Sequence, residues 1–71
     1  MNEANFYMQQ HATINGREVF LYLITCPIGY IFVVQYEDRY KALETILINE
    51  SLQKAEKKFE GICTKILKGA L

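Results

Sequence analysis

The longest uncharged stretch of this chain lies between Glu18 and Glu37, and a turn interrupts it near the middle. Val19 to Val34 reads VFLYLITCPIGYIFVV, in which only one threonine, one proline and one glycine fall outside the hydrophobic class. The central proline and glycine predict a hairpin, and a hairpin sends alternate side chains to opposite faces of its sheet. Because both alternating sets are apolar, the pattern predicts a sheet with two hydrophobic faces.

The register of this hairpin decides which side chains share a face. Cys26-Pro27-Ile28-Gly29 fits a type I turn closed by a left-handed glycine, which pairs Leu23 with Val33 and Ile24 with Phe32. This register predicts an aliphatic face and an aromatic face. The aliphatic face would hold Val19, Leu21, Leu23, Ile31 and Val33, and the aromatic face would hold Phe20, Tyr22, Ile24, Tyr30, Phe32, Val34 and Tyr36.

A first strand is expected from about Asn5 to Ile14, before Asn15-Gly16. Asn-Gly is the favoured pair for a two-residue type I′ turn, because both positions need a positive φ. If the strand pairing continues from this turn without interruption, Ala12 pairs with Val19 and Met8 pairs with Leu23. It adds Phe6, Met8 and Ala12 to the aliphatic face and Tyr7, Gln9 and His11 to the aromatic face.

The stretch from Lys41 to Ile48 fits either a helix or a strand. Its first half suits a helix, whereas Thr45-Ile46-Leu47-Ile48 is rich in β-branched residues and favours a strand. The apolar stripe of the helix that follows, extended backwards, misses Ile46 and Leu47. We therefore predict a fourth strand.

A C-terminal amphipathic helix is the clearest local prediction. Ser51 is a suitable N-cap, Lys65 and Lys68 suit the negative end of the helix dipole, and Gly69 is a natural stop. Its apolar stripe, at spacings of three and four, consists of Leu52, Ala55, Phe59, Ile62 and Ile66. Gly61 lies off this stripe and marks either a close backbone approach or a tolerated loss of helix stability.

These elements predict a single α+β domain over residues 1–71, an antiparallel meander followed by one helix (β-β-β-β-α). A helix about 10 Å wide cannot cover four strands spaced about 4.8 Å apart, and it leaves the opposite face untouched. The pattern does not decide which face the helix covers. Either way, an apolar face on the order of 500 Å² remains, about the largest patch that a soluble monomer shows.

Composition and charge narrow the classes of function. The chain has 71 residues, of which 51% are hydrophobic and 23% charged, so a folded core is expected. Lys plus Arg equals Asp plus Glu at eight each, which removes the global field that attracts nucleic acid or anionic lipid. A membrane span is disfavoured because Pro27 and Gly29 interrupt the apolar stretch. Without a signal-peptide pattern, the cytoplasm is the expected compartment.

Candidate catalytic and metal-binding residues are few. The predicted register puts His11, the only histidine, opposite Phe20 and roughly 20 Å from Cys26, too far for a Cys-His pair. Cys63 flanks the helical stripe as a small core residue. No spacing of cysteines or histidines is typical of a zinc site, and the glycines are isolated rather than grouped in a phosphate-binding loop. We therefore expect no enzymatic activity, no metal and no cofactor.

The expected function is a protein-interaction module that forms a homodimer through the uncovered apolar face, with the aromatic face as the candidate site. The alternative is a nucleic-acid-binding module in which bases stack on the aromatic face, with Arg17, Arg39 and Lys41 at its rim. The order of elements resembles that of small single-strand DNA-binding and interaction modules, in layout alone.

Overall fold

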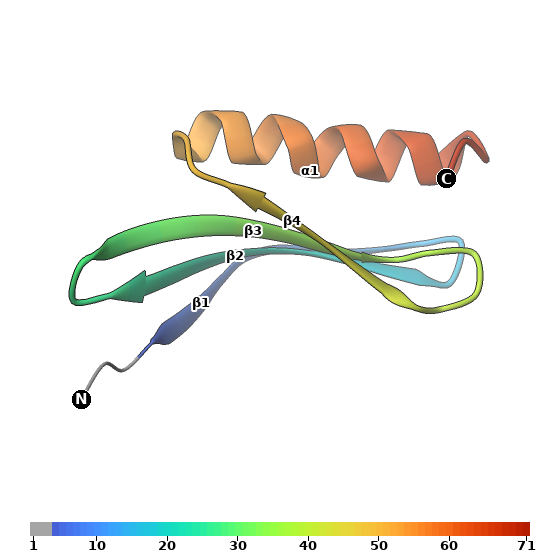
Figure 1. Cartoon of the computed structure of the whole chain (residues 1–71). Helices are drawn as coiled ribbons and strands as arrows, with labels where there is room; N and C mark the ends of the chain where they lie inside the picture. The colour runs from blue at the N-terminus through green and yellow to red at the C-terminus, as the bar shows by residue number, and fades with distance from the viewer. Residues whose placement is uncertain (1–3) are drawn as a thin grey trace.

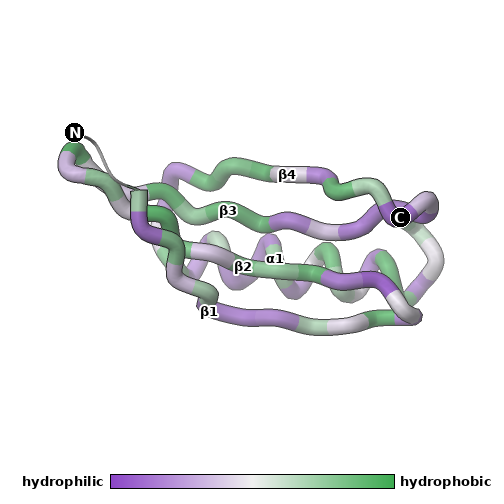
Figure 2. The backbone as a smooth tube through the Cα atoms, turned by 90° about the horizontal axis from the view of Figure 1, so that it is seen from below, coloured by the Kyte–Doolittle hydropathy of each residue, from purple (hydrophilic) through white to green (hydrophobic). Residues whose placement is uncertain are grey.

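The computed structural model describes residues 4–71 and confirms the β-β-β-β-α order. The strands β1 (Asn5–Ile14), β2 (Arg17–Cys26), β3 (Gly29–Glu37) and β4 (Leu43–Ile48) form one antiparallel sheet in the order β1-β2-β3-β4, and the helix α1 (Leu52–Leu67) follows. The helix lies across one side of the sheet (Figure 1). Figure 2 views the other side, where the strands lie in front of the helix. The fourth strand is thus confirmed.

The first turn and both helix ends follow the local sequence. Asn15 and Gly16 have φ values of 52° and 75°, as a type I′ turn requires. The Ser51 hydroxyl accepts the Lys54 main-chain N–H at 3.3 Å and caps the helix. At the other end, Gly69 adopts a φ of 76° and its N–H donates to the Ile66 carbonyl at 3.1 Å, which satisfies a carbonyl of the last turn.

The β2–β3 register differs from the predicted one by one residue. Cys26 pairs with Gly29, so the loop has two residues, and Leu23 faces Phe32 instead of Val33. A shift of one residue exchanges the two faces of a strand. The observed register keeps Gln35 and Glu37 away from the helix, whereas the predicted one would place them beside Leu21 and Val19 in the core.

The β1–β2 register is correct from Ile14 to Gln10 and then shifts. A bulge between Met8 and Gln10 pairs Met8 with Tyr22 and Phe6 with Ile24. The extra residue, Gln9, reverses the faces of the first residues of β1 relative to the prediction. Phe6 and Met8 therefore lie on the side of the sheet away from the helix.

The core lies between the helix and a mixture of the two predicted faces. It consists of Val19, Leu21, Phe32, Val34, Ile48, Ala55, Phe59, Ile62 and Ile66. Phe32 and Val34 were expected beside Phe20 and Tyr22, but the shifted register puts them under the helix with Val19 and Leu21. In residues 4–71, no helix is long and apolar enough to cross a membrane.

Candidate interaction surface

The side of the sheet away from α1, which we call the open face, is divided into two halves. Cross-strand pairing arranges its side chains in rows. The apolar half contains two rows that follow the Cys26–Gly29 pair at the β2–β3 turn: Phe6, Ile24 and Ile31, then Met8, Tyr22, Val33 and Leu47. The polar half contains the next two rows: His11, Phe20, Gln35 and Thr45, then Thr13, Glu18, Glu37 and Leu43. Hydrophobic side chains are therefore concentrated at one end of the open face.

The apolar half is hollow in its middle and raised at its edges. Phe6 on β1 and Leu47 on β4 are each 66% exposed, whereas Val33 between them is only 3% exposed. The N-terminal end of β1 bends away from the helix side (Figure 1). A hollow of about 360 Å³ is lined by Phe6, Tyr22, Ile24, Val33 and Gln35. Its shape and lining suit an apolar side chain of a partner.

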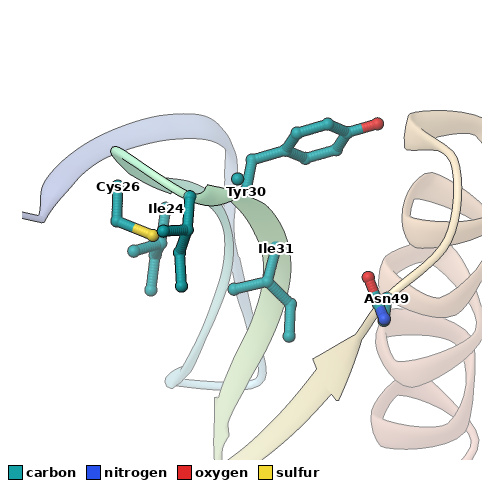
Figure 3. Close-up of a pocket in the computed structure, with 7 residues that line it drawn as sticks. Ile24, Cys26, Tyr30, Ile31 and Asn49 are labelled. Atoms are coloured by element: carbon teal, nitrogen blue, oxygen red, sulfur yellow. The ribbon is translucent and has the colours of Figure 1, made fainter.

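A second hollow of about 310 Å³ lies around the β2–β3 turn. Its lining includes Ile24, Cys26, Tyr30, Ile31 and Asn49, and Tyr30 extends to the other side of the ribbon from the two isoleucines (Figure 3). Ile24 belongs to both hollows, so the two form one apolar region. The polar side chains in this lining do not form an acid–base pair, and the hollow adjoins the apolar half of the open face.

The polar half has a hydrogen-bonded network of its own. Glu18 accepts bonds from the Thr13 hydroxyl at 3.0 Å and from the His11 ring, and the Glu18 main-chain N–H donates to the Glu37 carboxylate at 2.7 Å. The bond with His11, followed by that with Thr13, lowers the pKa of the Glu18 carboxyl. Gln35 donates to the Thr45 hydroxyl at 3.2 Å. This half is therefore suited to contact with water.

Stacked rings follow the open face from the polar half into the apolar half. His11 stacks on Phe20 with ring centroids 4.9 Å apart and an interplanar angle of 10°, and Phe20 stacks on Tyr22 at 5.7 Å and 22°. Such geometry stabilises the sheet surface itself. The role expected for His11, an ordinary neighbour of Phe20, agrees with this contact.

The cations expected at the rim of the aromatic face, Arg17, Arg39 and Lys41, bond to main-chain oxygens. Arg17 donates to the main-chain oxygens of Glu37 at 2.9 Å and Leu71 at 2.7 Å, and Arg39 donates to the Gly69 carbonyl at 3.2 Å. Both arginines thus bind the C-terminal segment that follows the helix. Lys41 donates to the Gly16 carbonyl in the first turn. None of these bonds directs a positive charge to the apolar half.

The structure separates the predicted site residues. Phe20, Tyr22 and Ile24 lie on the open face, while Phe32, Val34 and Tyr36 lie on the helix side in or against the core. Tyr30 has the parity of the helix side and is largely exposed near the turn. Sequence reasoning missed Phe6, Met8, Ile31, Val33 and Leu47 as members of the open face. The polar residues of β3 could have indicated which face is open. Gln35 and Glu37 alternate in step with Ile31 and Val33, so all four side chains lie on the same face of the sheet.

Within the described part of the chain, the thiols and carboxylates do not gather at one place. Cys26 is exposed and lies six residues after Phe20, the residue that pairs with His11. Cys63 lies on the helix. Partial burial raises the pKa of the Cys63 thiol, which disfavours the reactive thiolate. Within residues 4–71, no group of three or more potential ligands could hold a metal ion.

Comparison of the chain with models of protein families, with curated proteins and with solved structures finds no significant match. The site geometry is therefore the basis for the functional proposal below.

Proposed function

We propose that this chain is a non-enzymatic interaction module that forms a homodimer by covering the apolar half of its open face. The observation that carries this proposal is the concentration of uncharged, apolar side chains on the side of the sheet opposite the core. Phe6 and Leu47 at its edges are each 66% exposed, so the apolar half presents large hydrophobic side chains to solvent.

The dimensions of the apolar half predict a weak, reversible dimer. Two rows about 6.7 Å apart across strands about 4.8 Å apart define a patch of roughly 14 by 19 Å, or about 270 Å² in projection. A standard protein interface buries about 800 Å² per partner, and smaller ones are typical of transient complexes. We therefore expect a dissociation constant in the micromolar range or weaker.

A second copy is the occupant that the chemistry favours. The residues of the apolar half carry no charge, so contact between two identical copies has no like-charge cost. A chain of 71 residues has a small core, and association adds buried apolar surface to it. The free thiols of Cys26 and Cys63 support the cytoplasm as the compartment of this dimer.

The nucleic-acid alternative lacks the cations that phosphate contacts need. Among residues whose strand pairing places them on the open face, the charged side chains are the carboxylates of Glu18 and Glu37. Arg17 and Arg39 are bonded to the segment that follows the helix instead. We expect a labelled single-stranded oligonucleotide not to bind at low salt. Binding with a steep salt dependence would favour the alternative.

Sedimentation velocity tests the dimer, with a matched pair of exposed aromatic residues as probes. Between about 5 µM and 1 mM, the concentration window set by the expected weak association, the sedimentation coefficient should rise. Phe6→Lys, in the apolar half, should abolish this rise, whereas Tyr40→Lys, in the β3–β4 turn, should leave it unchanged. A folded protein that is monomeric at every concentration overturns the proposal.

A further inference from the structure

We infer that the two copies of the proposed dimer meet in a staggered arrangement in which their apolar halves overlap and their carboxylates lie outside the overlap. This inference rests on the proposed function and specifies how the open face is used. The two-fold axis would run across the strands, so that the polar halves extend in opposite directions into solvent. The separation of apolar and polar rows on one face is the observation behind it.

Face-to-face contact between identical sheets allows two simple axes, because an isologous two-fold must lie in the plane between the sheets. An axis parallel to the strands keeps the rows in register and places β1 over β4 of the partner and β2 over β3 of the partner. An axis perpendicular to the strands keeps each strand over its own copy and reverses the order of rows. In both cases the sheets are separated by about 10 Å, as in a β-sandwich.

The parallel axis conflicts with the charges of the polar half. It places Glu18 on β2 over Glu37 of the partner subunit, and symmetry repeats this contact. The network of Glu18, His11 and Thr13 would also lose its water without gaining a counter-charge. Like charges facing one another and buried polar groups both oppose association.

The perpendicular axis buries the apolar halves and leaves the carboxylates of the polar halves in water. With the axis between the two apolar rows, the row of Phe6, Ile24 and Ile31 covers the row of Met8 and Tyr22 in the partner. The two carboxylates of the polar half stay in water. The raised edges formed by Phe6 and Leu47 are then inside the contact, and the hollow around Val33 receives apolar side chains from the other copy.

Two leucines on β4 form a matched test. Leu43 and Leu47 lie on the same strand and the same face and are 58% and 66% exposed, but Leu43 is in the polar half and Leu47 in the apolar half. Leu47→Lys should weaken the dimer by tenfold or more, an order of magnitude typical of a central contact, and Leu43→Lys should change its dissociation constant by less than about twofold. Equal weakening by both variants overturns the stagger. Circular dichroism of each variant verifies that it folds.

A spin-label distance adds a second readout. The label is attached to Leu43→Cys in a background of Cys26→Ser and Cys63→Ala. Row, strand and sheet spacings place the two labelled backbone positions roughly 35 Å apart in the staggered dimer and roughly 18 Å apart when the rows are in register. The long distance together with a disruptive Leu47→Lys supports the inference, and the short distance overturns it.

The outcomes separate this inference from the proposed function. A monomer at all concentrations rejects the dimer itself. A dimer that tolerates Leu47→Lys rejects the open face as its interface, and a contact outside this face, such as edge-to-edge pairing of β1, then replaces it. A dimer weakened by both leucine variants, with the short label distance, rejects only the stagger.

Discussion

Gly61 offers a quantitative test of the structure, because a glycine in the middle of α1 weakens the helix without a visible packing reason. A Cβ atom added at this position would meet no heavy atom within 4 Å beyond the local helix. The close backbone approach considered from the sequence is thus absent from the described part of the chain, residues 4–71. Gly61→Ala should therefore gain helix propensity without steric cost.

The expected gain in the free energy of unfolding is about 1 kcal/mol, the difference in helix propensity between glycine and alanine. In a domain of this size, 1 kcal/mol corresponds to a rise in Tm of roughly 4–8 °C. Because the helix and the open face lie on opposite sides of the sheet, the substitution should leave the dissociation constant of the proposed dimer unchanged (Figure 1).

Thermal and urea unfolding followed by circular dichroism measure this gain, at several fixed protein concentrations because the proposed dimerisation would shift the apparent stability. Lys57→Ala, at an exposed position of the same helix, is the control and should change the free energy of unfolding by only a few tenths of a kcal/mol. An unchanged or lowered Tm for Gly61→Ala would refute the open space around this residue. A normal Tm gain with weakened association would place a partner on the helix.

Three further predictions concern the core, a cap and a carboxyl group. Leu21→Ala removes a fully buried side chain and should lower the free energy of unfolding by about 3–5 kcal/mol in urea, and a loss below about 1 kcal/mol would contradict the assigned core. Ser51→Ala should cost about 1 kcal/mol in the same assay, whereas Ser51→Asp should retain most of the cap. The Glu18 carboxyl should titrate below its ordinary pKa in an NMR titration, because His11 and Thr13 bond to its charged form. The stability it contributes is then complete above its unfolded-state pKa and lost as the pH falls through the lower folded-state pKa; titration at or above the ordinary value would exclude these bonds.

The elements with strong local signals could be predicted from sequence. Asn15-Gly16 allowed a two-residue turn with positive φ, and the observed angles agree. Ser51 and Gly69 were the expected helix boundaries, and four of the five stripe residues are buried as their spacing indicated. Leu52, in the first turn of the helix, is 40% exposed. These features depend on residues close together in the chain, which is why a single sequence is enough to recognise them.

The registers of β1 and β3 could not be predicted with the same success. Both alternating sets of the Val19–Val34 stretch are apolar, so hydrophobicity alone did not show whether Phe32 or Val33 belongs under the helix. The bulge at Gln9 has no comparable local signature, and it moves Phe6 to the open face. These two shifts explain why the residues of the open face differ from those of the predicted aromatic face.

The amino-acid sequence by itself determined the kind and order of the elements, the turn residues, and a surplus of apolar side chains over what one helix can cover. The tertiary structure decided which of those side chains are left uncovered. Successive side chains of a strand point to opposite faces of the sheet. One residue more or less in a loop or bulge therefore moves every later side chain of that strand to the other face. The number of residues in each loop and bulge depends on how the whole sheet packs against α1 while its polar residues stay in water.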